Sequence, residues 1–163
     1  MAFGKKKSYT LDEALRRMQR YCTYRDRCHK EVVETLRDMG MIPEAIDRIV
    51  VDLIADDFLN EERFALEFTR GKFHQKYWGK TRIRRELEVR GISKYLIRKA
   101  LGGIDEQDYQ RTFDALAEKR WHALAAEKDL RKKKRKLADY LFYRGWETSM
   151  VYDKIRELAG GKA

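Results

Sequence analysis

A leucine followed four residues later by a glycine occurs at three related points of this chain, and this repeat constrains the fold more than any other feature. The glycines are Gly40, Gly91 and Gly145, spaced 51 and then 54 residues apart. Self-similarity at such a period is typical of stacked supersecondary units, so we expect a structure that is built three times over. The matching apolar positions, counted from each glycine, are Val32, Ile83 and Leu137 (eight before), Leu36, Leu87 and Leu141 (four before), Met41, Ile92 and Trp146 (one after), Ile46, Ile97 and Val151 (six after), and Val50, Leu101 and Ile155 (ten after).

Each copy of the repeat predicts a helix, a tight corner and a second helix. Apolar residues four apart lie on one helix face, and the glycine can adopt the left-handed conformation that ends a helix. Pro43 stands at a plausible first helical position, and Ser93 is a candidate cap for the second helix of its copy. Thr148 or Ser149 is the corresponding candidate in the third copy.

A further helix precedes each corner. Thr10 with Glu13 has capping-box spacing, and Asn60 and Asp105 are candidate caps for the other two helices. No segment alternates apolar and polar residues for long enough to predict a strand. The fold class is therefore all-α, an elongated, curved array of three tandem three-helix repeats. The predicted helices are 10–23, 27–39, 44–55, 60–76, 79–90, 94–102, 105–126, 129–144 and 148–159. The predicted domains are a disordered basic tail over 1–9, repeats over 10–59, 60–104 and 105–159, and a disordered tail over 160–163.

Composition agrees with an extended array. Charged residues make up 39% of the chain and the mean hydropathy is −0.76, which leaves little apolar material for one thick core. A wide binding surface for a large partner is expected rather than a deep pocket. The two cysteines, Cys22 and Cys28, are too few for a disulfide framework, and no apolar stretch suits a signal peptide or a membrane span. We expect a cytoplasmic protein with structural thiols.

Catalytic and metal-binding patterns are missing from the sequence. The three histidines, His29, His74 and His122, are far apart, and no glycine-rich phosphate loop is present. The acidic pairs at 56–57 and 61–62 are explained by helix capping and solvation. The sequence predicts no enzyme activity, no cofactor and no metal site.

Positive charge is concentrated in the middle of the chain. Residues 1–60, 61–104 and 105–163 carry net charges of 0, +7 and +3. Together with Phe73, Tyr77 and Trp78, the middle cations suit a phosphate backbone, because cations release condensed counterions and flat rings offer stacking surfaces. The alternative, a solvated face with the rings packed in a corner, stays open. The cations are Arg70, Lys72, Lys76, Lys80, Arg82, Arg84, Arg85 and Arg90.

A second set of cations forms an unbroken run near the start of the predicted eighth helix. Six consecutive residues cannot all lie on one helix face, and like charges in adjacent turns reduce stability. The run therefore suggests an anionic partner, and a nuclear-import signal is the other possibility. Its members are Arg131, Lys132, Lys133, Lys134, Arg135 and Lys136.

Three stretches follow one another from the junction of the first two repeats onward. They are 57–65 (Asp-Phe-Leu-Asn-Glu-Glu-Arg-Phe-Ala), 78–87 (Trp-Gly-Lys-Thr-Arg-Ile-Arg-Arg-Glu-Leu) and 90–92 (Arg-Gly-Ile). Together they resemble the RecX family, the bacterial regulators of the RecA recombinase. The order of these parts identifies the family more than any one of them. The matching positions are Leu59, Asn60, Arg63, Phe64, Ala65, Gly79, Ile83, Leu87, Gly91 and Ile92. Cys28, where many relatives have serine, and Lys80, where proline is frequent, depart from the family pattern.

The resemblance implies three tandem three-helix repeats and a monomer without a catalytic site. It also implies binding in the helical groove of the RecA filament on single-stranded DNA, which restrains filament growth, ATP hydrolysis and strand exchange in DNA repair, recombination and the SOS response. Single-stranded DNA is then contacted directly or through the filament. Most of the motif positions are expected to be architectural. Arg63 either pairs with a nearby carboxylate or faces the partner.

Two other functions remain open at this point. An autonomous basic DNA-binding protein is one, because a corner glycine with an apolar residue six positions later has helix-turn-helix spacing and the sequence pI is 9.6. Against it, a close crossing of two helices favours a small residue four before the glycine, where this chain has leucine. A general helical scaffold without nucleic-acid contact is the other.

Overall fold

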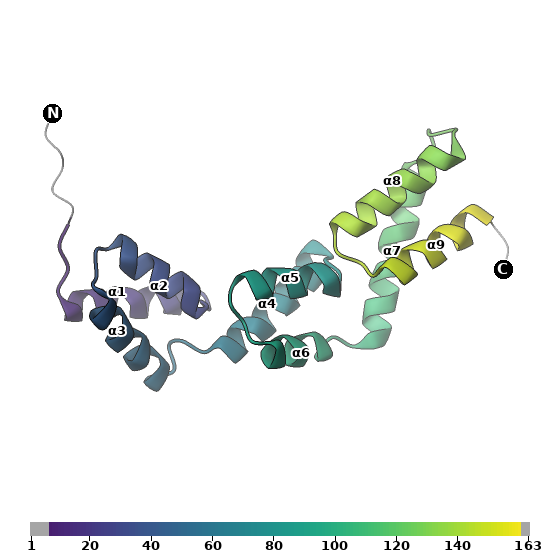
Figure 1. The fold of residues 1–163 in the computed structure, drawn as a ribbon. Coiled ribbons are helices and arrows are strands. Elements are labelled where there is room, and N and C mark those ends of the chain that lie inside the picture. The colour runs from purple at the N-terminus through teal and green to yellow at the C-terminus, as the bar shows by residue number, and fades with distance from the viewer. Residues whose placement is uncertain (1–6, 161–163) are drawn as a thin grey trace, which may run out of the picture.

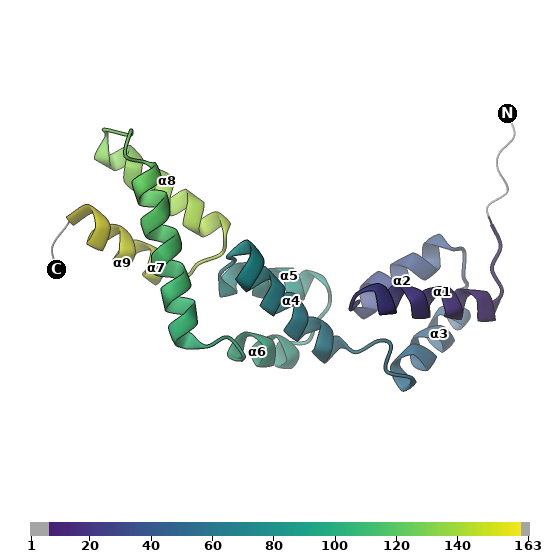
Figure 2. The same ribbon diagram turned by 180° about the vertical axis from the view of Figure 1, so that it is seen from behind.

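The computed structural model describes residues 7–160, and over these residues it has nine helices and no strand. The all-α prediction is confirmed. Three lobes of three helices follow one another in a curved row (Figure 1). The first helix of each lobe lies on one side of the row, toward the viewer in Figure 2, and the second and third helices lie on the other. The helices are α1 (Leu11–Tyr24), α2 (His29–Asp38), α3 (Pro43–Ala55), α4 (Glu61–Lys76), α5 (Lys80–Val89), α6 (Lys94–Gly102), α7 (Glu106–Ala123), α8 (Leu130–Tyr143) and α9 (Thr148–Gly160).

The first helices of the three repeats begin at the predicted caps. The side-chain oxygens of Thr10, Asn60 and Asp105 accept backbone N–H bonds at 3.1, 2.9 and 2.9 Å. Ser93 likewise caps α6, since its Oγ accepts from the residue three positions later at 3.2 Å. The ninth helix begins at Thr148, as predicted, but Thr148 and Ser149 are its first two residues, so neither precedes the helix as its cap.

The predicted seventh helix, which continued to residue 126, is too long. The backbone N–H of Ala125 bonds to the carbonyl of His122 at 3.1 Å, a three-residue step that tightens the end of the helix. Leu124, which follows α7, is 9% exposed and belongs to the core. The chain therefore turns at this point toward α8.

The three corners share one backbone geometry. Gly40, Gly91 and Gly145 have φ of +81°, +75° and +87°, as expected for helix-ending glycines. In each corner the N–H of the residue after the glycine donates to the carbonyl of the leucine four before it, at 3.1, 3.1 and 3.2 Å. This is the Schellman arrangement. The three leucines are fully buried, so the same residue supplies both a core side chain and the acceptor of the corner.

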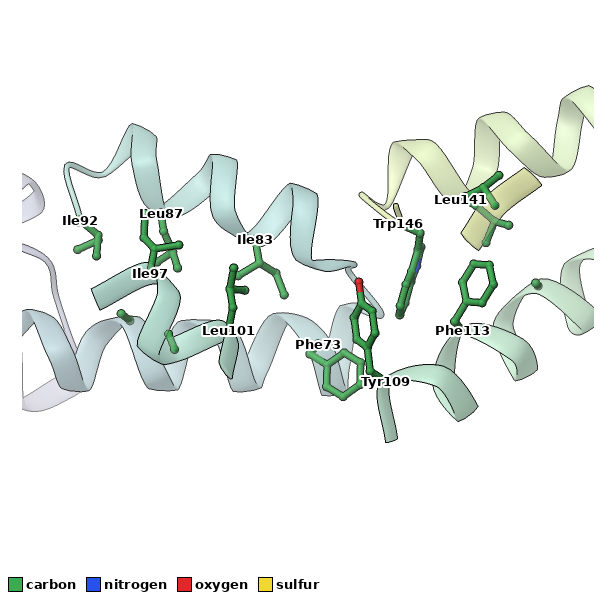
Figure 3. Packing of buried hydrophobic residues seen from close by; sticks show 14 of the residues in the cluster. Phe73, Ile83, Leu87, Ile92, Ile97, Leu101, Tyr109, Phe113, Leu141 and Trp146 are labelled. Carbon is green, nitrogen blue, oxygen red and sulfur yellow. The ribbon is translucent and has the colours of Figure 1, made fainter. Parts of the chain in front are cut away.

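The described residues form two apolar cores rather than three. One core belongs to α1–α3. The other is continuous through the second and third repeats, where Phe73, Tyr109, Trp146 and Phe113 follow one another across the boundary (Figure 3). The ring centroids of Tyr109 and Trp146 lie 4.6 Å apart. The second and third repeats are therefore joined through buried aromatic side chains.

Close approach of two backbones joins the same repeats. The N–H groups of Gly79 and Thr81, at the start of α5, donate to the carbonyls of Arg144 and Gly145 at 2.8 and 3.1 Å. A Cβ on Gly79 would lie 2.4 Å from the Gly145 oxygen, and a Cβ on Gly145 would lie 2.2 Å from Cβ of Arg82. Only glycine fits at both positions. The α8–α9 corner of the third repeat thus caps a helix of the second.

Tyr109 completes this boundary. Its hydroxyl accepts the N–H of Lys80 at 2.9 Å and donates to the Glu147 carboxylate at 2.7 Å. Burial, together with the bond to Glu147, raises the pKa of the Tyr109 phenol. The phenol therefore stays protonated and keeps its donor at neutral pH.

The first repeat meets the second through polar contacts and through Cys28, which is buried in the core of the second and third repeats. Arg63 on α4 donates from Nε to Asp26 at 2.7 Å and from Nη1 to Asp57 at 3.1 Å. Its Nη2 donates to the carbonyl of Asp57 at 3.0 Å. Lys30 on α2 reaches the carbonyl of Val89 at 3.0 Å. One planar guanidinium thus joins the segment after α1 to the segment after α3.

Both predicted tails fall largely outside the described residues. Of the residues that are described there, Tyr9 packs against the first core and Gly160 is the last residue of α9. Cys22 and Cys28 are buried and free, and burial raises the pKa of both thiols. Between residues 7 and 160, no helix is long and apolar enough to span a bilayer, and no three His, Cys, Asp or Glu side chains are placed to hold a metal ion.

Candidate functional site

A cationic groove runs between α5 and α6. Along α5, Lys80, Arg84 and Glu88 are spaced four residues apart and therefore lie on one face. Along α6, Lys94 and Arg98 have the same spacing and line the opposite wall. The cavity volume is about 540 Å³. The buried side chains of Ile97 and Leu101 are also part of its lining.

The charge of this α5–α6 groove is not neutralised by the chain. Its four cations form no ion pair within residues 7–160, and Glu88 is the one acid in the lining. The ammonium of Lys80 lies 4.7 Å from the ring centroid of Tyr109, which fixes the stem of this lysine without removing its charge. Several unpaired cations facing one concavity attract anions, because their fields add there.

These cations are not a shared feature of the three repeats. Relative to Gly91, Lys80 lies eleven residues before and Arg84 seven before. Lys94 lies three residues after it and Arg98 seven after. The charges at these four positions differ between all three repeats. They differ even between the second and third repeats, which share a core. The equivalent residues are His29, Val33, Pro43 and Asp47 in the first repeat, and Lys134, Ala138, Thr148 and Tyr152 in the third.

Sequence reasoning named Lys80 and Arg84 but missed Lys94 and Arg98. Their signal was present, since two cations four residues apart on a helix share a face. Comparing positions relative to the three corner glycines would have shown that only the middle repeat is cationic at all four. The groove itself depends on how α5 and α6 pack, which spacing alone does not describe.

Arg63 does not belong to this groove. Of the two alternatives for this residue, the structure has the ion pair, since Asp26 and Asp57 hold its guanidinium. The hydrogen bond to Asp26 raises the pKa of Arg63 further above its usual value. Arg63 is therefore an architectural residue at the junction of the first two repeats.

Arg82 is also committed to the fold. Its guanidinium lies 4.0 Å from the ring centroid of Trp78 and 4.7 Å from that of Tyr143, and Nη1 donates to the Tyr143 carbonyl at 3.0 Å. Lys72 lies 4.9 Å from the Trp78 ring centroid. Burial, with the nearby cations, lowers the pKa of Lys72. These two cations stabilise the corner between α4, α5 and α8.

The remaining middle cations differ in their freedom. Arg70 pairs with Glu67 at 3.0 Å, and Arg90 pairs with Glu86 at 2.9 Å. Lys76 and Arg85 are exposed and have no ion pair among the described residues, but neither lines the α5–α6 groove. The predicted middle cluster is therefore split between structural contacts, a groove and isolated surface charges.

The aromatic residues of the middle cluster offer less stacking surface than the sequence suggested. Phe73 is 1% exposed and lies in the core, as Figure 3 shows. Trp78 contacts two cations of the chain itself, Lys72 and Arg82. Tyr77, with φ of +57°, is 47% exposed. At Phe73 and Trp78 the structure agrees with the alternative in which the rings pack a corner.

The basic run (131–136) occupies the first two turns of α8, in the third repeat (Figure 1). Lys136 pairs with Glu127 at 2.7 Å, and Lys133 lies 4.0 Å from the Trp121 ring centroid. The other four cations are exposed without an ion pair between residues 7 and 160. Cations near a helix N-terminus oppose the helix dipole, so helix stability does not explain the run. None of its residues lines the α5–α6 groove.

Comparison with known proteins gives a consistent family. The chain matches the model "RecX, second three-helix domain" over residues 60–101 and "RecX, third three-helix domain" over 106–155. The two matches together cover more than half of the chain. The first match contains all four cations of the groove.

Curated relatives and solved structures agree with these matches. A "Regulatory protein RecX" from Clostridium botulinum strain Alaska E43 is 30% identical over 129 residues, 78% of this chain and 60% of that relative. One from Chlorobaculum tepidum is 28% identical, over 95% of this chain and 91% of the relative. The crystal structure of RecX from Lactobacillus salivarius superposes with a TM-score of 0.77 at 24% identity, covering 91% of this chain and 96% of the other, which supports the shared fold. On these sequence matches, the chain belongs to the RecX family of regulatory proteins.

Proposed function

We propose that this chain binds the RecA filament on single-stranded DNA and inhibits filament growth, ATP hydrolysis and strand exchange in DNA repair and recombination. It acts as a monomer and has no catalytic step of its own. Membership of a family of regulatory proteins supports this proposal, and so does the curved row of helices, which presents a long surface to a polymeric partner.

The observation that carries the proposal is the unpaired charge of the α5–α6 groove. Arg84 and Arg98 line its two walls, and the other two repeats have no cation at either position. An unpaired cation reduces stability slightly through repulsion from its neighbours, so its presence is better explained by an external anion. An acidic surface of a filament subunit is the expected occupant.

The rigid connection of the second and third repeats supports the same function. Their common core fixes the α5–α6 groove relative to the basic run on α8. A body with two separated cationic regions held at a fixed spacing can contact two neighbouring subunits of a polymer. Such a bridge would oppose the subunit motions that accompany ATP hydrolysis and subunit addition.

ATP hydrolysis by the cognate recombinase on single-stranded DNA tests the proposal. Substoichiometric wild-type protein should slow hydrolysis, and the double variant Arg84→Glu, Arg98→Glu should need at least tenfold more protein for the same inhibition. Lys119→Glu is the control for charge reversal elsewhere, because Lys119 is exposed on α7 without an ion pair among the described residues and lies outside the groove. An unchanged hydrolysis rate over a wide titration with the wild-type protein would refute the proposal.

A second candidate is an autonomous DNA-binding protein of helix-turn-helix type. One observation favours it: α6, the helix after the middle corner, carries the unpaired cations Lys94 and Arg98. This candidate predicts tight binding to duplex DNA with a steep salt dependence and no effect on the recombinase. The hydrolysis titration and a duplex-binding titration together separate the two candidates.

A further inference from the structure

The first repeat separates its charges in space, although its net charge is zero. Arg16, Arg17 and Arg20 lie within two turns of α1, after the two acids of its first turn, Asp12 and Glu13. Acidic residues instead gather on and after α3, where the one cation is Arg48. These acids are Glu44, Asp47, Asp52, Asp56 and Asp57. A balanced total therefore conceals a basic face on α1.

An exposed row of side chains on α1 consists of Arg16, Arg20 and Tyr24, which we call the α1 stripe. The three residues are spaced four apart and so share one helix face. Arg16 and Arg20 form no ion pair within residues 7–160, and Tyr24 is 85% exposed. A ring with so much exposed surface in a folded protein has a face available for stacking.

Two adjoining grooves extend the α1 stripe. Their cavity volumes are about 480 and 180 Å³, and both are lined by Arg17 and Arg20. Glu13 is the one acid in either lining. The larger groove contains Tyr24, and the smaller contains Arg16, so the two grooves together follow the stripe.

The walls of these grooves are held in place by cation–aromatic contacts. The guanidinium of Arg27, a residue that is 8% exposed, lies 3.6 Å from the ring centroid of Tyr21, and its Nε donates to the Tyr21 carbonyl at 3.0 Å. Arg17 donates to the hydroxyl of Tyr9 at 3.0 Å. Side chains that are already ordered lose less entropy on binding.

We propose that the α1 stripe is a binding site for single-stranded nucleic acid. Cations one helical turn apart can follow successive phosphates along a strand, and an exposed tyrosine can stack on an unpaired base. Duplex DNA keeps its bases stacked on one another, so the Tyr24 ring would find no base face there. The combination of Arg16, Arg20 and Tyr24 therefore fits a single strand better than a duplex.

The α1 stripe is separate from the α5–α6 groove. α1 belongs to the core of the first repeat, and α5 and α6 belong to the other core. α1 also lies on the side toward the viewer in Figure 2, whereas α5 and α6 lie on the side toward the viewer in Figure 1. This proposal does not depend on the recombinase, and its test contains none.

Fluorescence anisotropy of a labelled oligothymidylate with the purified full chain tests the proposal. The variant Arg16→Gln, Arg20→Gln should weaken binding and lower the slope of log affinity against log salt by roughly 1.4, about 0.7 for each phosphate contact on a single strand. Tyr24→Ala should weaken binding roughly fivefold to a hundredfold through lost stacking, and should leave binding to a duplex of equal length unchanged. Lys119→Gln is the control for loss of an exposed positive charge outside the stripe, and circular dichroism melting checks that each variant is folded.

The result that would overturn the proposal is equally specific. If wild type does not bind the oligothymidylate, or if Arg16→Gln, Arg20→Gln binds it with the affinity and salt slope of the wild type, the α1 stripe is no nucleic-acid site. If Tyr24→Ala weakens duplex and single-strand binding equally, the preference for a single strand is wrong. A loss of binding in Arg84→Gln, Arg98→Gln alone would assign the strand to the α5–α6 groove instead.

Discussion

Gly145→Ala should destabilise the second and third repeats far more than Gly91→Ala, although both glycines end a helix in the same conformation. Both have a left-handed φ, which costs an alanine about 1–2 kcal/mol. At Gly91 nothing lies within 4 Å of an added Cβ, so this conformational cost is the whole effect. At Gly145 the added Cβ would lie 2.2 Å from Cβ and 2.4 Å from the backbone N of Arg82, so the α8–α9 corner must move away from α5.

The movement breaks identifiable bonds. The N–H groups of Gly79 and Thr81 lose the carbonyls that they bond at 2.8 and 3.1 Å, and Arg82 loses the Tyr143 carbonyl at 3.0 Å. At about 1 kcal/mol for each hydrogen bond, the loss is about 3 kcal/mol. Gly145→Ala should therefore lower the free energy of unfolding by about 4–5 kcal/mol, against about 1–2 kcal/mol for Gly91→Ala.

Guanidinium denaturation followed by tryptophan fluorescence measures this difference. Trp78, Trp121 and Trp146 all lie in the second and third repeats, so the signal reports on their common core. Gly40→Ala is the further control, because its corner belongs to the first repeat, which has no tryptophan, and nothing lies within 4 Å of its added Cβ. A difference of less than about 1 kcal/mol, the contribution of one hydrogen bond, between the free energies of unfolding of Gly145→Ala and Gly91→Ala would refute this prediction. The close packing of the corner on α5 would then not be a main source of stability.

Three further predictions concern charged side chains. Arg82→Glu should lower the free energy of unfolding by about 2 kcal/mol, because it loses the hydrogen bond to the Tyr143 carbonyl and the aromatic contacts. Arg85→Glu, at an exposed residue, should leave the melting temperature unchanged. Thermal circular dichroism measures the melting temperatures of both variants. Arg63→Lys should speed amide hydrogen exchange at the junction of the first two repeats, since a lysine cannot bond two carboxylates and two carbonyls at once; exchange as slow as in the wild type would contradict the clamp. Lys154 is 4% exposed among three carboxylates. Burial lowers its pKa but the carboxylates raise it more, to a net value above the ordinary 10.5. The folded state therefore holds this proton more tightly than the unfolded state does. The resulting stabilisation is present at neutral pH and is lost as the pH rises above about 10.5. Melting curves at high pH should show this loss in the wild type and not in Lys154→Met.

The corners could be predicted from the sequence because each is encoded locally. A glycine that ends a helix, an apolar residue after it and a leucine before it specify a Schellman turn without reference to the rest of the molecule. Thirteen of the fifteen repeat positions that flank the glycines are buried, and Met41 and Val50 of the first repeat are the two that are partly exposed. Local chemistry repeated three times thus gives the helices and their corners directly.

The union of the second and third repeats could not be predicted in this way. In the sequence, Gly145 stands in the same apolar pattern as Gly40 and Gly91, and all three have the same backbone conformation. Only at Gly145 does another backbone, that of Arg82, approach so closely. The requirement for glycine there comes from a contact between residues far apart in the chain, which spacing within one repeat does not contain.

Charged residues were the hardest to interpret, because pairing is decided by tertiary structure. Arg82 and Arg84 are two positions apart, which on a helix is about 200° around the axis. One guanidinium therefore contacts Trp78 and Tyr143 of the fold, and the other lines the α5–α6 groove. Counting the cations in a stretch of sequence does not distinguish Arg82, which contacts the fold, from Arg84, which lines the groove.

The repeat itself supplies the criterion that separates architectural from functional charge. Residues at one position relative to the corner glycine occupy equivalent places in the same three-helix unit. A side chain that each unit needs should therefore recur in all copies, whereas one that joins two repeats, as Arg82 does through the Tyr143 carbonyl, need not. The buried leucine recurs three times, whereas Arg84 corresponds to Val33 and Ala138. Since the unit folds with an apolar residue at this position in two copies, the arginine in the third is not needed for folding. Its unpaired charge therefore has to be explained by something outside the chain, and substituting it should change binding before it changes stability.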